Sequence, residues 1–372
     1  MHRRHFLTST CLAGLLPSCR RPTDPALRPP PGPSDQSPPG LDETGATILW
    51  YASLAPSTHN TQPWAVRILT AREWILEADH SRSLPVVDPD NRELLLSLGA
   101  FAENLALAAG SFGLQACFQV LTRDPGAREI MKVNLHPGGP TPAIPLSVLQ
   151  QRMTMRNGLK KTPIRAEHVQ SLRRVLAEAG QQHMHFFPNG TEHVACLARG
   201  AAEQFRLQSE RDEAQEELIR WLRLNPEAET KHRDGLSLKA MGLTGIKAWF
   251  VSHFTRPEDF LKDSFRQKGM DAVREQVKQG GGWIVLTSSG GGVAECIQTG
   301  RQFQRLALQA HRLGIGLHPM SQYLEEHQGL EAIRKHHQAG LRPQFLLRCG
   351  YVDAFPEPVS LRRPLAWFIR SA

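Results

Sequence analysis

The chain has 372 residues, of which 40% are hydrophobic and 22% charged, and its mean hydropathy is −0.35. These values exclude a disordered chain and a polytopic membrane protein, and the length allows two or three domains or one large fold. The formal net charge is +8, falls to +5 without residues 1–40, and comes from scattered Lys and Arg. The sequence has no cluster of Lys and Arg of the kind that binds the phosphate backbone of a nucleic acid, so we expect no nucleic-acid partner. A small anionic ligand is compatible with this charge.

Residues 1–40 are predicted to be a delivery segment. The pair Arg3-Arg4 precedes a short apolar run, residues 8–16, which is typical of a twin-arginine export signal and too short to span a bilayer. The residues before Cys19 also resemble a lipoprotein cleavage box, and a proline-rich tether follows. We therefore expect export by the twin-arginine machinery to the periplasm, with a lipid anchor at Cys19 left open. The alternative is a basic N-terminus with a chance apolar run.

The patterns that follow predict an α+β chain. Helices are expected over residues 43–55, 99–113, 147–152, 166–179, 192–222 and 300–314, and strands over residues 65–70, 74–78, 117–122, 131–135, 283–287 and 344–350. The polar region 223–244, broken by Pro and Gly, has no clear core face and is interpreted as an excursion that could cover a site. Helices packed on sheets in two halves are the expected architecture.

Two of these helices resemble each other at a spacing of 201 residues. One runs from Gly99 to Gly113 and the other from Gly300 to Gly314, and six positions coincide, including both pairs of glycines. Each has the composition of a buried helix that ends at a glycine C-cap. Chance similarity between Ala- and Leu-rich helices is the alternative, but glycines at both ends favour an internal duplication.

A polar turn stands directly before the first predicted strand. It carries Ser57, His59, Asn60 and Gln62 and is followed by a proline and a tryptophan. Fixed donors and acceptors of this kind suit the polar rim of a heteroaromatic ring. The alternative is a capped turn whose side chains lie in water, and Trp64 argues against it because it would fix the turn to the core.

This turn resembles the A-P-S-x-x-N-x-Q-P-W segment of the nitroreductase family of flavin mononucleotide (FMN) enzymes. The histidine before the asparagine is similar to the Acg-like subgroup, whose chains fuse two nitroreductase-like halves. The resemblance extends over residues 41–370, loosely over 223–277. It implies an internally duplicated nitroreductase-like fold that mimics the family dimer within one chain, with a first half at 41–146 and a second half at 147–372 that carries an insertion near 223–277. It also implies cofactor contacts from the four polar residues of the turn.

A second motif opens the second half. Arg152, Met153, Thr154 and Arg156 resemble the family's R-x-[ST]-x-R segment, which receives the FMN phosphate. Two guanidinium groups beside a hydroxyl provide bidentate donors for a dianion. On its own the motif is weak, because a solvated face with two arginines has the same pattern. In the family's dimers one subunit provides the phosphate contacts and the other the ring contacts, so one chain here could complete one site between its halves.

The C-terminal region adds further candidates. The resemblance implies that Arg348 and one of Arg362 and Arg363 reach the FMN phosphate or ribityl chain, although a basic surface tail would look the same. Ser321 and Gln322 open a short helix after the second repeat, and its free N–H groups could face the flavin ring.

We find one copy of each motif, so we expect one FMN per chain and a monomer that suffices for one site. The glycine runs lack dinucleotide spacing, the histidines lack metal-ligand spacing, and no Gly-x-Ser-x-Gly segment occurs, so we expect no metal and name no catalytic side chain.

By resemblance, the function would be two-electron transfer through flavin N5 from NAD(P)H or another reductant to a nitroaromatic or quinone. One alternative is a flavin-sequestering protein with a closed site and little turnover. Another is an envelope protein without a cofactor.

Overall fold

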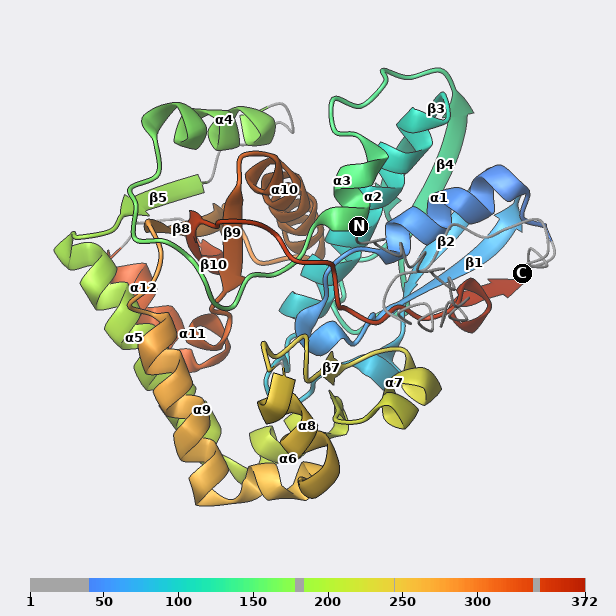
Figure 1. The fold of residues 1–372 in the computed structure, drawn as a ribbon. Helices are drawn as coiled ribbons and strands as arrows, with labels where there is room; N and C mark the ends of the chain where they lie inside the picture. The colour runs from blue at the N-terminus through green and yellow to red at the C-terminus, as the bar shows by residue number, and fades with distance from the viewer. Residues whose placement is uncertain (1–39, 178–183, 244, 337–341, 372) are drawn as a thin grey trace, which may run out of the picture.

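The computed structural model describes residues 40–177, 184–243, 245–336 and 342–371. The expected export signal and Cys19 lie outside the described residues, so both remain predictions. Within the described part, helices and two main sheets form an α+β architecture, as the sequence predicts (Figure 1).

The first sheet has the strand order β11-β1-β2-β4-β3. Its strands are β1 (Trp64–Thr70), β2 (Glu73–Ala78), β3 (Leu114–Val120), β4 (Glu129–Pro137) and β11 (Ile369–Ser371). The first four pair antiparallel, whereas β11 pairs parallel to β1 with Val66 opposite Ile369. The C-terminal end of the chain therefore completes the sheet built by its N-terminal half (Figure 1).

The second sheet has the strand order β5-β8-β10-β9 and is antiparallel throughout. Its strands are β5 (Met184–Pro188), β8 (Gly282–Ser288), β9 (Ile315–Pro319) and β10 (Arg342–Tyr351). Apart from β11, the first sheet has its strands in the order β1-β2-β4-β3, and the second has β5-β8-β10-β9. In each sheet, the fourth of these strands along the chain therefore lies between the second and the third. In both sheets, one long helix connects the second strand to the third. The two sheets thus share one topology.

The two repeat helices cross at their matching glycines. They are α2 (Arg92–Ser111) and α10 (Val293–Arg312), and a Cβ atom added at Gly99 would overlap the carbonyl oxygen of Ile297 and lie 2.9 Å from Gly300 Cα. The glycines after the two helices, Gly113 and Gly314, have φ of +71° and +70°. This confirms the predicted buried helices and the glycines that follow them. The predicted starts at Gly99 and Gly300 are wrong, because both helices begin seven residues earlier and these two glycines lie inside them at the crossing.

Polar contacts flank this crossing. The buried carboxylate of Glu103 pairs with Arg301 at 3.0 Å and with Arg305, and Gln304 Nε2 donates to Asn104 Oδ1 at 2.7 Å. By length and composition α2 could cross a membrane, but most of it is buried within the fold, as expected of a core helix.

The described residues form further helices outside these two sheets. They are α1 (Glu43–Ser53), α3 (Leu146–Gln151), α4 (Ala166–Ala177), α5 (Glu192–Glu210), α6 (Asp212–Arg220), α7 (Pro226–His232), α8 (Gly245–Phe254), α9 (Asp263–Gln276), α11 (Gln322–Glu325) and α12 (His327–His336). Most predicted elements are confirmed to within a few residues. The single helix expected over 192–222 is wrong, because the chain breaks it at Arg211 into α5 and α6.

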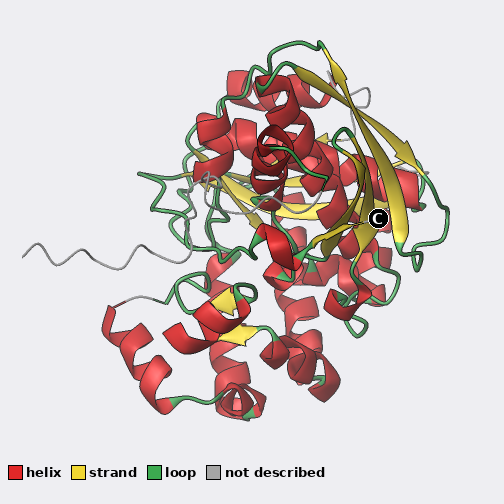
Figure 2. Cartoon of the chain, turned by 90° about the vertical axis from the view of Figure 1, so that its right-hand side faces the viewer, coloured by secondary structure: helices red, strands yellow, loops and turns green. Residues whose placement is uncertain are grey.

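The excursion has a core of its own, so the prediction of no core face in residues 223–244 is wrong. Leu222, Leu224 and Leu238 are buried and gather apolar neighbours from α6 and α8. The short parallel pair β6 (Leu222–Arg223) and β7 (Leu236–Ser237) holds this cluster together. Figure 2 shows these helices and the two short strands on one side of the main sheets. Within the described residues, the cysteines at 117, 196, 296 and 349 form no disulfide.

Candidate functional site

The predicted polar turn adopts a strained backbone. His59, Asn60 and Gln62 have φ of 48°, 53° and 54°, in the left-handed region that residues other than glycine seldom occupy. Ser57 Oγ accepts a hydrogen bond from the backbone N–H of Gln62 at 2.9 Å, which closes the turn. Strain of this kind persists only where the surroundings hold it, and it gathers at functional sites.

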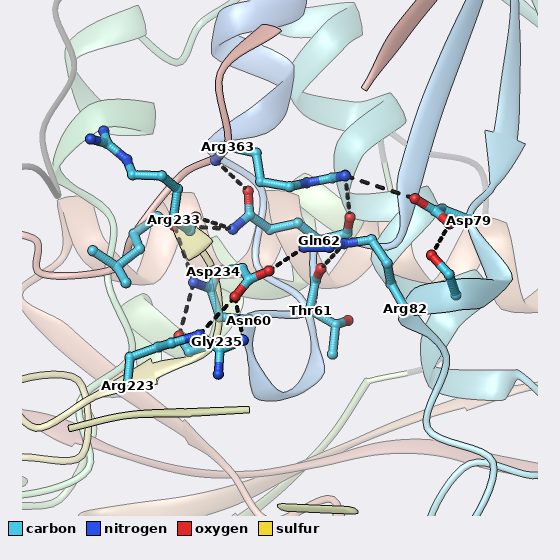
Figure 3. Close-up of polar contacts among 12 residues, drawn as sticks. Asn60, Thr61, Gln62, Asp79, Arg82, Arg223, Arg233, Asp234, Gly235 and Arg363 are labelled. Atoms are coloured by element: carbon cyan, nitrogen blue, oxygen red, sulfur yellow. Dashed lines mark hydrogen bonds and ion pairs between the residues drawn. The ribbon is translucent and has the colours of Figure 1, made fainter. Parts of the chain in front are cut away.

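Two amide side chains of the turn bind other segments of the chain. Asn60 Nδ2 donates to the carbonyl oxygens of Gly235 and Leu361, both at 3.1 Å. Gln62 Nε2 donates to the carbonyl oxygens of Arg233 at 2.9 Å and Leu361 at 3.3 Å. Both amides therefore join the turn to the excursion and to the C-terminal segment, and their predicted contact with a cofactor remains a prediction (Figure 3).

Residues 233–235, here called the strap, are fixed across the turn by a buried carboxylate. Asp234 pairs with Arg82, and its other oxygen accepts from Arg223 Nε at 3.0 Å and from the terminal nitrogen of Arg223 at 2.6 Å (Figure 3). The N–H of Gly235 donates to the carbonyl oxygen of Asn60 at 3.1 Å. The excursion is thus held against the turn by ion pairs and by backbone hydrogen bonds.

The C-terminal arginines contact the same turn from the other side. Arg362 donates to Asn60 Oδ1 at 3.0 Å and to the carbonyl oxygen of Leu54 at 3.0 Å. Arg363 donates to the carbonyl oxygens of Gln62 at 2.5 Å and Trp64 at 2.7 Å. Both arginines thus support the turn with their contacts, and the buried Nε of each has no partner.

The segment with the two predicted phosphate arginines runs along the edge of the second sheet. The N–H of Met155 donates to the carbonyl oxygen of Leu317 on β9 at 2.9 Å. Arg152, Met153 and Thr154 line a small cavity of about 10 Å³, together with side chains of α10, β9 and the loop after β10. The predicted motif therefore borders a cavity instead of a solvated helix face.

Arg348 and His318 extend this basic region inside the sheet. Arg348 is fully buried on β10, where it donates to the carbonyl oxygen of Gln276, to that of Arg156 at 2.9 Å and to His318 Nδ1 at 2.5 Å. Its Nε has no partner. The Arg348 contact with Arg156 brings the two predicted phosphate-binding segments together.

Four arginines of this region have no carboxylate partner among the described residues. They are Arg152, Arg156, Arg348 and Arg362, and burial lowers the pKa of Arg152 and Arg348 to about 10 and that of Arg362 to about 9. The charge of Arg152 further lowers the pKa of Arg362, so these two lie close together. A buried cation without a counterion is strongly unfavourable. This donor set fits a multiply charged anion.

Two histidines are held neutral beside these arginines. Burial, and then the charge of Arg156, lower the pKa of His59 to about 4. Burial, and then Arg348 and Arg156, hold the pKa of His318 well below its ordinary range. The structure therefore brings the early turn and the arginine segment to one place, as the sequence predicts, and adds His318.

Ser321 and Gln322 lie at α11, which is only four residues long. Gln322 Nε2 donates to the carbonyl oxygen of Ala201 at 3.5 Å, and the Ser321 hydroxyl contacts the carboxyl group of Glu325. That carboxyl group interacts with Glu93, which accepts a hydrogen bond from Thr58. Ser321 is thus joined to the turn through side chains that the sequence did not single out.

Comparisons with known proteins identify a related segment. No family model matches the chain. Over 75 residues it is 44% identical to two Mycobacterium tuberculosis proteins, "Putative NAD(P)H nitroreductase Rv3131" of strain H37Rv and "Putative NAD(P)H nitroreductase MT3217" of strain CDC 1551. That segment is 20% of this chain and 21% of each relative, so the chain spans about a fifth of the curated relatives that it matches.

Solved structures align with larger parts of the chain at low similarity. The FMN-dependent nitroreductase NfnB of Mycobacterium smegmatis, in complex with NADPH, aligns with 60% of this chain and 95% of its own at 15% identity and a TM-score of 0.37. A nitroreductase of Desulfitobacterium hafniense with bound FMN aligns with 57% and 91% at 12% identity and a TM-score of 0.34. The local similarity is therefore what links the chain to proteins named nitroreductases.

Proposed function

We propose that this chain is an FMN-binding oxidoreductase of the nitroreductase type. The observation that carries the proposal is the group of four arginines without carboxylate partners, which lies against the turn that resembles the family's ring-contacting segment. A flavin with a terminal phosphate satisfies both features, because it presents a dianion at one end and a heteroaromatic ring at the other. The segment that is 44% identical to proteins named nitroreductases supports the same assignment.

The phosphate would be held by Arg152, Arg156, Arg348 and Arg362. Their unpartnered Nε atoms, on Arg152, Arg348 and Arg362, can donate to phosphate oxygens and so remove the cost of burying these charges. When bound, the flavin would supply two-electron hydride transfer to a conjugated acceptor such as a nitroaromatic or quinone. We name no side chain that acts directly on the acceptor.

The turn and the α11 segment would border the ring. Ser57, Asn60 and Gln62 hold the turn in its left-handed geometry, and His59 presents an unprotonated imidazole toward the arginines. We further propose that the two halves arose by duplication, because the sheets share one topology and the repeat helices cross at equivalent glycines. The chain would then form one site, and a monomer would suffice.

A flavin-sequestering protein is the second candidate, and the strap supports it. Asp234 fixes residues 233–235 across the turn through two arginines. A strap that stayed closed would keep nicotinamide away from the ring and leave little turnover. Export to the periplasm, with or without a lipid on Cys19, remains a proposal that cell fractionation of the native protein would test.

Absorbance spectroscopy tests the proposal directly. The full chain, purified with added FMN and freed of excess, should retain one flavin, and the double variant Arg152→Ala/Arg156→Ala should lose it. Arg206→Ala is the matched control, because this half-buried arginine pairs with Glu203 and Glu210 on its own helix. Absence of flavin from the wild-type protein after reconstitution would refute the assignment.

Anaerobic titration then separates the two candidates. Bleaching of the bound flavin by NADPH supports the oxidoreductase. Bleaching by dithionite alone supports the sequestering protein or an enzyme with another electron donor.

A further inference from the structure

The helix α8 carries a cluster of exposed aromatic side chains. Among the residues that the structure describes, six large hydrophobic side chains are exposed, and three of them stand on α8. They are Trp249, Phe250 and Phe254, with exposed fractions of 56%, 57% and 63%. The ring centroids of Trp249 and Phe254 lie 5.8 Å apart, and those of Phe250 and Phe254 5.0 Å apart. The three side chains therefore form one continuous patch, here called the aromatic face of α8.

The opposite side of α8 holds the helix on the excursion. Ala248 and Val251 pack against the buried leucine cluster together with side chains of α6. At 100° per residue, Trp249, Phe250 and Phe254 fall within an arc of about 140° on the other side. Figure 1 shows α8 at the lower end of the molecule, beside α6 and away from the two main sheets. The aromatic face therefore points to solvent from a helix that is itself anchored in the fold.

The chain around the aromatic face is basic. Residues 235–257 contain two lysines and one arginine but no Asp or Glu. Lys239, before α8, and Arg256, after it, are both exposed. Two carboxylates follow at positions 258 and 259, and the second, Asp259, pairs with Lys262 at 2.6 Å. An aromatic surface with basic residues on both sides complements an anionic partner.

The size of the aromatic face favours a lipid surface over a second protein. An aromatic side chain offers about 150–250 Å², so the three exposed fractions correspond to roughly 260–440 Å². A stable protein interface buries about 800 Å² on each partner, which is more than this face provides. A bilayer requires no matching side chains, because aromatic rings enter its interfacial region and basic side chains meet anionic headgroups.

We propose that α8 docks the protein on the surface of an anionic lipid bilayer. The aromatic face would enter the headgroup region, and the basic residues on either side of the helix would contact the headgroups. This inference goes beyond the proposed function and does not depend on flavin binding. Arg156 donates to the carbonyl oxygen of Ala240 at 2.9 Å, a few residues before α8. Docking would therefore hold the candidate site close to the bilayer.

Co-sedimentation of the full chain with lipid vesicles, without added flavin, tests the docking. We expect binding to vesicles of equal parts phosphatidylglycerol and phosphatidylcholine. The triple variant Trp249→Ala/Phe250→Ala/Phe254→Ala should lower this affinity at least about 100-fold, because the apolar surface is lost. The matched control is Phe112→Ala/Trp367→Ala, which removes exposed aromatic side chains elsewhere in the fold and should bind like the wild type.

The basic residues are tested by charge removal. Lys239→Gln/Arg256→Gln should lower the affinity for the anionic vesicles roughly 5-fold for each residue. Binding to vesicles of phosphatidylcholine alone should be weaker in the wild type and unchanged in this variant. Equal affinities of the wild type for the two kinds of vesicle would overturn the choice of an anionic bilayer.

Fluorescence quenching by lipids brominated on their acyl chains locates the contact. Of the seven tryptophans, Trp249 and Trp367 are exposed and the others are buried or half-buried. We expect quenching in the wild type and in Trp367→Phe and its loss in Trp249→Phe, which keeps an aromatic ring and so keeps the binding. Every variant carries the same residues 1–40, so binding through that segment cannot produce this difference.

The outcomes are distinct. Unchanged vesicle binding in the triple variant, or quenching that persists in Trp249→Phe, would overturn the proposal. Light scattering that shows a wild-type dimer and a monomeric triple variant, without vesicle binding, would also overturn it, because a second copy would then cover the aromatic face. Circular dichroism shows whether each variant folds, and if the triple variant does not, Trp249→Phe and Trp367→Phe decide alone. Flavin retention is measured separately, so a failure of the proposed function and a failure of the docking are distinguishable.

Discussion

The crossing of α2 and α10 can be tested by adding one methyl group at Gly300. A Cβ atom there would overlap the carbonyl oxygen of Leu96 and lie 2.9 Å from Leu96 Cα. Because the obstacle is backbone, no rotamer change relieves it and the helices must separate. We expect overpacking to lower the free energy of unfolding by about 3 kcal/mol, near the upper end for such changes. About 1 kcal/mol of this is offset, because Ala has a higher helix propensity than Gly. The net loss of about 2 kcal/mol corresponds to roughly 3 °C in Tm.

Urea unfolding followed by tryptophan fluorescence measures this loss, since Trp64, Trp74 and Trp283 are buried. The matched control is Gly269→Ala in α9, where the added Cβ would only touch the Phe205 ring at 3.7 Å. That variant should gain about 0.5–1 kcal/mol. If Gly300→Ala were as stable as this control, the helices would not cross at their glycines.

Three further predictions concern the site. The double variant Arg152→Ala/Arg156→Ala should weaken FMN binding at least about 100-fold, since a hydrogen bond to a charged group contributes roughly 1.5–3 kcal/mol. Isothermal titration calorimetry measures the affinity, and an unchanged affinity would exclude the phosphate assignment. Asp234→Asn should free the strap, speeding both limited proteolysis near residue 233 and flavin exchange; equal rates would mean that the ion pairs do not hold it. Because His59 binds its proton at about pH 4 when folded and near 6.5 when unfolded, stability should fall as the pH drops from 6.5 to 4. His59→Gln should flatten that dependence, and identical pH profiles of the urea midpoint would contradict the assignment.

Local pattern predicts most of the sheets and the long helices. Alternation and β-branched runs identify β1, β2, β4, β8 and β10, and glycine caps identify the ends of α2 and α10. The missed elements depend on distant partners. The three residues of β11 have no strand pattern of their own and become a strand only because β1 offers a free edge. The leucines of the excursion lack a helical or strand period, so their burial could not be read from spacing.

In the candidate site, too, the residues with a local motif could be predicted and those that depend on distant partners could not. The turn and the arginine segment carry recognisable motifs, and the structure places His59 beside Arg156, as the sequence predicts. Asp234 gives no local signal, because its importance lies in pairing with Arg82, 152 residues away in the chain. Glu93 likewise looks like an ordinary helix carboxylate until the fold buries it between Thr58 and Arg92.

The arginines of the site separate into two groups by their partners. Arg82 and Arg223 share the carboxylate of Asp234, and Arg363 lies 3.8 Å from Asp79 and donates to two backbone carbonyls, although its buried Nε has no partner, so all three have a carboxylate of the chain beside them. The arginines of the phosphate assignment lack a carboxylate within the described residues. A protein that only needed structural cations would neutralise both groups in the same way. We infer that the first group builds the wall of the site and that the second is arranged for a charge that arrives with a ligand.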